Sequence, residues 1–101
     1  MSTPQVETFL YDEANEDEFA NHGLSAAIVD RVLESAFVLV RNRRGRRGLY
    51  LLIGQDYGGA FLSVPIEKTS TPGLWRPITA WPSKQSEISR LKQFKGRNND
   101  Q

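Results

Sequence analysis

Two apolar runs in the middle of the chain flank a short polar turn. Phe37–Val40 and Leu49–Ile53 are rich in β-branched, aliphatic and aromatic residues, and Gly45 and Gly48 lie between them. Runs of four or five such residues around a glycine-containing connection are typical of a β-hairpin. Glycine readily adopts the positive φ angles that a tight turn needs. We therefore predict a hairpin over residues 37–53 and place it at the centre of a small sheet.

The chain before this hairpin begins with one strand and one helix. Val6–Tyr11 alternates apolar and polar residues well enough to predict a short strand. Asp12 is suited to cap a helix over residues 13–22, and Gly23 is suited to end it. This helix has few apolar residues, so we expect it on the surface, anchored mainly by Phe19.

A second helix is predicted over residues 26–34, with Ser25 as its N-cap. Its apolar residues recur on one helical face, which should pack on the sheet. They are Ile28, Val29, Val32 and Leu33. The two helices could form a helix–turn–helix pair that reads DNA. We disfavour this interpretation because the first helix is strongly acidic and neither helix offers a basic face.

Two further strands and a last helix follow, over residues 60–68, 74–81 and 84–95. Pro65 and Pro77 lie inside the two strands and favour an edge position or a bulge, because proline donates no hydrogen bond to a neighbouring strand. Ser83 is placed to cap the helix and Gly96 to end it. The predicted order is β-α-α-β-β-β-β-α, an α+β fold with a small antiparallel sheet and helices packed on it.

The length of 101 residues fits one domain, 1–101, with loose polar tails at 1–5 and 97–101. No apolar run approaches the ~20 residues that a membrane helix needs, so we expect no membrane partner. The N-terminus lacks the pattern of a secretory signal, and the absence of cysteine excludes disulfides and thiol chemistry. Together these features predict a cytoplasmic protein.

The net charge of +1 hides a strong asymmetry along the chain. Residues 1–35 hold eight acidic residues and one arginine, a net of −7, whereas residues 36–101 hold twelve basic and four acidic residues, a net of +8. Five of these basic residues lie in the hairpin turn: Arg41, Arg43, Arg44, Arg46 and Arg47. A basic region of this kind indicates an anionic partner such as nucleic acid. The alternative is that both regions are ordinary solvated surfaces.

Few residues of the chain are suited to catalysis or metal binding. The chain has one histidine, His22, and no cysteine, which excludes the usual zinc sites. The acidic residues lack the spacing of a calcium loop, and no phosphate loop, dinucleotide fingerprint or nucleophile elbow is present. We therefore predict no metal and no cofactor. His22 itself is either a helix-end residue that the helix dipole favours or a general acid–base.

The turn Gly45-Arg46-Arg47-Gly48 has the GxxG spacing of the RNA-binding loop in KH domains, although here the loop joins two strands. Glycines allow close approach to a phosphate and arginines grip it with two hydrogen bonds, so a phosphate contact is one interpretation. The other is a solvated turn whose charge prevents edge-to-edge pairing. Of the two tryptophans in the late strand, Trp75 and Trp81, we expect one in the core and one at a rim.

Three segments, in this order, resemble BrnT-type toxins. The opening, from Tyr11 to Asn15 and then Asn21 to Leu24, resembles their "WDxxK–N–KHGV" motif. Ala26 to Ser35 stands where the family has its second helix. Trp75 to Trp81 followed by Ser83 to Leu91 resembles the strand-to-helix ending "xRIISARxAxxxER". The likeness covers roughly residues 8–94, with Trp81 in place of the second arginine of the last motif.

The resemblance implies a RelE-like fold and the toxin role in a type II toxin–antitoxin module, with metal-independent cleavage of RNA through attack by the 2′-hydroxyl. By position, His22, Arg76 and Glu87 would be the catalytic residues. The five turn arginines, Trp81 and Lys84 would hold the RNA. The expected partners are a cognate antitoxin and RNA, including ribosome-bound mRNA, with a homo-oligomer as a further option. The alternative is a catalytically inactive relative that binds nucleic acid or protein.

Overall fold

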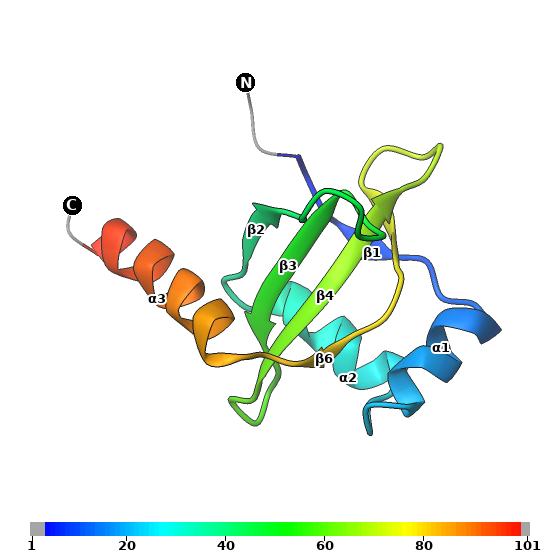
Figure 1. The fold of residues 1–101 in the computed structure, drawn as a ribbon, viewed down its shortest axis with the longest axis horizontal. Helices are drawn as coiled ribbons and strands as arrows, with labels where there is room; N and C mark the ends of the chain where they lie inside the picture. The colour runs from blue at the N-terminus through cyan, green and yellow to red at the C-terminus, as the bar shows by residue number, and fades with distance from the viewer. Residues whose placement is uncertain (1–3, 100–101) are drawn as a thin grey trace.

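The computed structural model describes residues 4–99, which form a six-stranded sheet, three α-helices and one 3₁₀ helix (Figure 1). Residues 1–3 and 100–101, the outer parts of the two predicted tails, lie outside the described residues. The elements are β1 (Thr8–Phe9), α1 (Glu13–Ala20), α2 (Ala26–Asp30), η1 (Arg31–Glu34), β2 (Val38–Arg41), β3 (Tyr50–Gln55), β4 (Phe61–Lys68), β5 (Leu74–Pro77), β6 (Trp81–Pro82) and α3 (Gln85–Asn99). The α+β class is therefore confirmed.

The sheet is mixed, so the prediction of a purely antiparallel sheet is wrong. Its order is β1-β5-β4-β3-β2, and β6 pairs with the first half of β4. β1 runs parallel to β5, with Phe9 opposite Trp75, while the other pairs are antiparallel. Pairing between strands so far apart in the chain leaves no local signal in the sequence.

The predicted hairpin is confirmed, but its place in the sheet is not. β2 and β3 pair with Val38 opposite Ile53 and Arg41 opposite Tyr50. Gly45 and Gly48 in the turn have φ of 84° and 93°. However, β2 is an edge strand, and the centre of the sheet is β4, which pairs with β3, β5 and β6.

Pro65 explains this difference. Pro65 lies inside the central strand β4, where its carbonyl accepts a hydrogen bond from Ile78 N at 2.9 Å. The N and C=O of one residue point to the same side of a strand, so the missing N–H of Pro65 also faces away from β3. The nitrogen of Pro65 faces residues 78–80, which separate β5 from β6. The predicted single strand 74–81 is therefore two strands, and Pro65 needs no edge position.

The helix starts agree with the predicted caps in the first half of the chain. Asp12 caps α1 and Ser25 caps α2, and Gly23 has the expected positive φ of 73°. The second helix is α-helical only to Asp30 and continues as η1. α3 continues through Gly96, which was predicted to end it. A glycine inside a helix destabilises it by only ~1 kcal/mol. None of the described helices is both long enough and apolar enough to span a membrane.

The main core lies between the sheet and the first two helices. Figure 1 shows α2 behind β3 and β4. Phe19, Val29 and Val32 are fully buried there, against strand residues including Leu52 and Trp75. Phe19 therefore anchors α1 as predicted, and Trp75 is the core tryptophan. The Cα radius of gyration, 13.0 Å, is that of a compact domain of this length.

Side chains alternate across a strand, so β3 and β4 also present a second face, with Leu51, Ile53, Ser63 and Pro65. α3 packs against this face at the β2–β3 side through Leu91, which is fully buried. α3 projects away from the sheet (Figure 1), so it does not lie over the whole of this face. Ile53 and Ser63 on this face are nevertheless buried. The candidate site lies there.

Candidate nucleic-acid interface

An open groove of about 620 Å³ runs across the second face of the sheet. Its floor is apolar, and its two sides are the turn between β2 and β3 and the start of α3. The floor consists of Val40, Leu51, Ile53, Pro65 and Ile78. Six cationic residues also line the groove: Arg41, Arg43, Arg46, Arg47, Lys84 and Arg90. The guanidinium of Arg41, however, lies over the Tyr50 ring on the other face of the sheet, 5.7 Å from the ring centre. The acidic residue Glu18 of α1 is also among the lining residues. The volume is in the range of binding sites for small organic groups, roughly 300–1,000 Å³.

Asn42 stabilises the arginine-rich turn, residues 42–49, which joins β2 and β3. Its side-chain amide donates to the carbonyls of Arg47 at 2.7 Å and Gly48 at 3.2 Å, and its Oδ1 accepts from Arg43 N at 3.0 Å. Gly48 lies close to β4, where a Cβ would come within 3.2 Å of the Ile66 backbone. The turn therefore presents its exposed arginines from a fixed backbone. Asn42 was not among the predicted site residues, although asparagine commonly stabilises turns in this way.

Glu87 is the carboxylate on the opposite side of the groove. Its Oε1 accepts three hydrogen bonds, from Lys84 N at 2.8 Å, Ser63 Oγ at 2.8 Å and Trp81 Nε1 at 3.1 Å. The bond from Lys84 N is half of a capping box, since Lys84 precedes the first turn of α3. These three donors fix the carboxylate at the start of the helix, and none of them reaches Oε2.

Ser83, the predicted cap of α3, has another role. Its Oγ lies 2.8 Å from Ser63 Oγ, and Ser63 in turn donates to Glu87. Ser63 is fully buried in β4, so it anchors the start of α3 to the sheet. Ser63 was not among the predicted site residues. The available signal was a serine at a position of β4 flanked by apolar residues, where a buried hydroxyl needs a partner.

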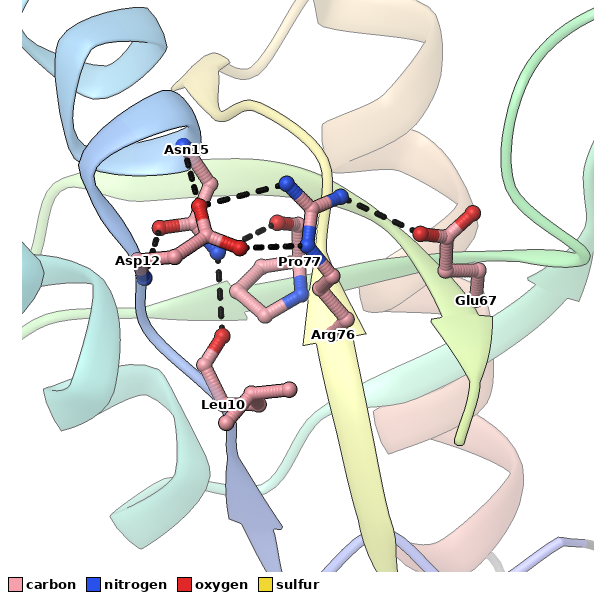
Figure 2. A network of polar contacts seen from close by, with 6 residues as sticks. All are labelled: Leu10, Asp12, Asn15, Glu67, Arg76 and Pro77. Atoms are coloured by element: carbon pink, nitrogen blue, oxygen red, sulfur yellow. Dashed lines mark hydrogen bonds and ion pairs between the residues drawn. The ribbon is translucent and has the colours of Figure 1, made fainter. Parts of the chain in front are cut away.

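Arg76 lies outside the groove. Its Nε and Nη2 donate to the two carboxylate oxygens of Asp12 at 2.8 and 3.2 Å, and its Nη1 donates to Glu67 at 3.1 Å (Figure 2). Only 20% of the Arg76 side chain is exposed. The hydrogen bonds from Arg76, and then the one from Asn15 N, hold the pKa of Asp12 below its usual value. The bonds to Asp12 raise the pKa of Arg76 further. Arg76 is thus occupied by two carboxylates.

Asn15 lies beside this ion pair and is fully buried (Figure 2). Its amide nitrogen donates to the carbonyls of Leu10 and Pro77, both at 2.9 Å, and its Oδ1 accepts from Asp12 N at 3.0 Å. One side chain therefore joins the chain leaving β1, the start of α1 and the end of β5. The matching of Asn15 to the toxin motif did not indicate this structural role.

The other predicted site residues divide between the groove and the surface elsewhere. Trp81 and Lys84 line the groove, and Trp81 is half-buried at its rim as predicted. His22 is exposed in the turn after α1, and neither His22 nor Arg44 lines the groove. The structure thus brings Glu87 together with Arg43, Arg46 and Arg47, three of the five predicted turn arginines. It separates them from Arg76 and His22.

Thr79 adds an unpaired polar group at the groove. It is one of the lining residues, and its Oγ1 is buried with no hydrogen-bond partner within residues 4–99. Within the same range, no three His, Cys, Asp or Glu side chains are grouped so that they could hold a metal ion. Comparison with protein-family models, curated proteins and solved structures gives no match. The resemblance to BrnT-type toxins therefore stays a prediction.

This arrangement suits the binding of a polyanion. Cations on both sides of a groove can neutralise successive phosphates, and arginine can bind a phosphate with two hydrogen bonds. The carboxylate of Glu87, held in one orientation beside these cations, can take a proton from a bound hydroxyl.

Proposed function

We propose that this domain binds RNA in the groove between the β2–β3 turn and α3, and cleaves it without a metal ion. The observation that carries the proposal is the groove, which five cationic residues besides Arg41 line together with the anchored carboxylate of Glu87. On the resemblance to BrnT-type toxins, we further propose that the activity is that of a toxin in a toxin–antitoxin module. A cognate antitoxin would then cover this groove.

In the proposed reaction the 2′-hydroxyl of one nucleotide attacks the adjacent phosphorus, and the bond from phosphorus to the 5′-oxygen breaks. Glu87 takes the proton of the 2′-hydroxyl, and Lys84 gives a proton to the departing 5′-oxygen. The groove arginines stabilise the negative charge that builds on the phosphate oxygens. The products are a 2′,3′-cyclic phosphate and a free 5′-hydroxyl, so the atoms balance without water or metal.

Arg76 and His22 are not needed in this version of the mechanism. The hydrogen bonds of Arg76 to Asp12 and Glu67 make it a structural residue of the β1–β5 region. His22 is exposed in a turn outside the groove. Of the motif Arg76–Glu87, only the second half, Trp81 to Glu87, therefore takes part in the proposed reaction.

The direct test is incubation of the purified protein with labelled RNA in excess EDTA. We expect fragments that end in a 2′,3′-cyclic phosphate, and growth arrest when the protein is expressed alone. Glu87→Gln should still bind RNA but lose cleavage by at least ~100-fold, the usual contribution of a general base. Glu13→Gln, an exposed change outside the groove, is the matched control and should cleave normally. Equal cleavage by Glu87→Gln and the control would refute the role of Glu87.

A second candidate is RNA binding without cleavage. It is favoured by Arg76 lying outside the groove and by the structural bonds that Glu87 already makes to Ser63, Trp81 and Lys84. In that case the wild-type protein should bind RNA with strong salt dependence and leave it intact. The same EDTA experiment separates the two candidates, because only the ribonuclease gives cyclic-phosphate ends.

A further inference from the structure

We infer that the groove holds an unpaired nucleobase against its apolar floor, so that the domain selects single-stranded RNA over duplex RNA. This inference rests on the proposed RNA binding and deepens it by naming the form of RNA. It depends on three features of the groove that phosphate binding does not explain. These are its apolar floor, the fixed ring of Trp81 and the unpartnered hydroxyl of Thr79.

The floor is the first feature. Val40 and Leu51 are only half-buried, so they expose apolar surface between the two charged sides. The other floor residues, Ile53, Pro65 and Ile78, are buried and expose little. Phosphates and riboses would leave this surface exposed to water. A nucleobase has two apolar faces, and covering such a face with apolar or aromatic side chains is a major source of affinity for single strands.

Trp81 is the second feature. Its indole N–H is already bonded to Glu87 Oε1 at 3.1 Å, so the ring is held in one orientation beside the groove. Because the indole N–H is already hydrogen-bonded, Trp81 can contact a ligand only through the face or edge of its ring. Rings beside arginine side chains are the usual stacking platforms of proteins that bind single strands. Because Trp81 also touches Glu87, a base stacked there would bring its own ribose near the proposed general base.

Thr79 is the third feature. An unpaired buried hydroxyl destabilises a folded protein, and Oγ1 of Thr79 has no partner among the described residues. Because Oγ1 of Thr79 is buried, contact with a base requires a change of the Thr79 side chain to another staggered χ1 rotamer. The hydroxyl can then both donate and accept. A base on the floor would bring the polar edge that this hydroxyl lacks. Since every base has donors or acceptors on its edge, this contact does not by itself select one base.

The apolar and unpaired groups of the groove argue for a single strand, because they can contact a base but not a phosphate. In a duplex the bases are stacked and paired, so that only phosphates and riboses face a protein groove of this size. A duplex would contact the exposed arginines and leave the floor, Trp81 and Thr79 untouched. An unpaired nucleotide can turn its base into the groove while its phosphates meet the cations on both sides.

Binding can be measured separately from cleavage with 2′-O-methyl strands, which have no attacking hydroxyl. The probes are one such strand, the same strand with its bases removed, and its duplex, each followed by fluorescence anisotropy. We expect the intact strand to bind more tightly than the other two by roughly 5- to 150-fold, the contribution of one stacked base. Trp81 fluorescence should be quenched by the intact strand alone.

Two variants test the named residues. Thr79→Val keeps the shape of the side chain. It should lower the affinity for the intact strand by roughly 2- to 10-fold, the range for one hydrogen bond. Leu51→Ala removes part of the floor, and it should also lower the affinity for the intact strand alone. Thr8→Val, an exposed threonine of β1, is the matched control for the first change, and thermal melting checks that each variant is folded.

The outcomes separate the inference from the proposed function. If all three probes bind equally well and Thr79→Val and Leu51→Ala bind like the wild type, the nucleobase site is refuted while RNA binding stands. If none of the probes binds, both the inference and the proposed function are refuted. Arg46→Ala should weaken every probe by the same factor, because it removes a phosphate contact rather than a base contact.

Discussion

Replacing Asn15 with alanine tests how the polar network beside the sheet holds the domain together. The Asn15 side chain is fully buried and makes three hydrogen bonds, to Leu10 O, Pro77 O and Asp12 N. Alanine makes none of them. The two carbonyls and the N–H group would then be left in a site that the folded protein shields from water.

The expected loss of stability follows from these three bonds. Each hydrogen bond contributes about 0.5–1.5 kcal/mol to the free energy of unfolding, so three contribute about 1.5–4.5 kcal/mol. The better helix propensity of alanine offsets about 0.5 kcal/mol. A net loss of about 1–4 kcal/mol is large against the 5–15 kcal/mol typical of whole domains. It corresponds to a fall in Tm of about 4–8 °C for each kcal/mol lost.

Urea denaturation followed by circular dichroism measures this change as a shift of the unfolding midpoint. Asn21→Ala is the matched control, because Asn21 also belongs to the α1 region but its side chain is exposed. We expect the control to change the free energy of unfolding by less than about 0.5 kcal/mol. If Asn15→Ala is destabilised no more than Asn21→Ala, the network does not hold β1, α1 and β5 together as described.

Two further predictions concern charge. Replacing Arg46 and Arg47 together with alanine should weaken RNA binding and reduce the slope of log affinity against log salt by up to about 1.4, or about 0.7 for each phosphate of a single strand that is no longer neutralised. An unchanged slope would show that the turn does not contact phosphate. The second prediction is that Asp12→Asn, which still caps α1, destabilises the domain at neutral pH and has progressively less effect below about pH 4. The pKa of Asp12 is lowered in the folded state, so its contribution is present above the unfolded pKa and is lost as pH falls through the folded pKa. Urea midpoints of both proteins between pH 2.5 and 7 measure this, and a difference that does not vary with pH would contradict it.

The features that the sequence predicted well have local causes. The β2–β3 hairpin is specified by two apolar runs and by the two turn glycines, Gly45 and Gly48, whose positive φ the structure confirms. The caps Asp12 and Ser25 depend on contacts within three residues, which are visible in the sequence itself. The burial of Phe19 followed from the scarcity of other apolar residues in α1.

The features that were missed depend on contacts between distant parts of the chain. The central place of β4 was hidden because Pro65 argued for an edge, and only the gap between β5 and β6 makes that proline acceptable in the middle of the sheet. Arg76 has no near neighbour of opposite charge in sequence, yet it pairs with Asp12, 64 residues away. Glu87 was selected by motif position alone, and its anchoring to Ser63 could not be predicted before the pairing of β4 with β6 was known.

The most direct test of the central claim, that RNA occupies the groove beside α3, uses the two tryptophans of the chain. The Trp81 indole N–H lies at the groove and is bonded to Glu87, whereas the Trp75 indole N–H lies elsewhere and is bonded to Gln5 O at 3.0 Å. Each gives its own indole signal in a ¹H–¹⁵N correlation spectrum. On titration with a non-cleavable 2′-O-methyl strand, we expect the Trp81 signal to shift with saturation and the Trp75 signal to stay in place. A shift of the Trp75 signal on RNA binding, or the absence of a shift of the Trp81 signal, would contradict the account.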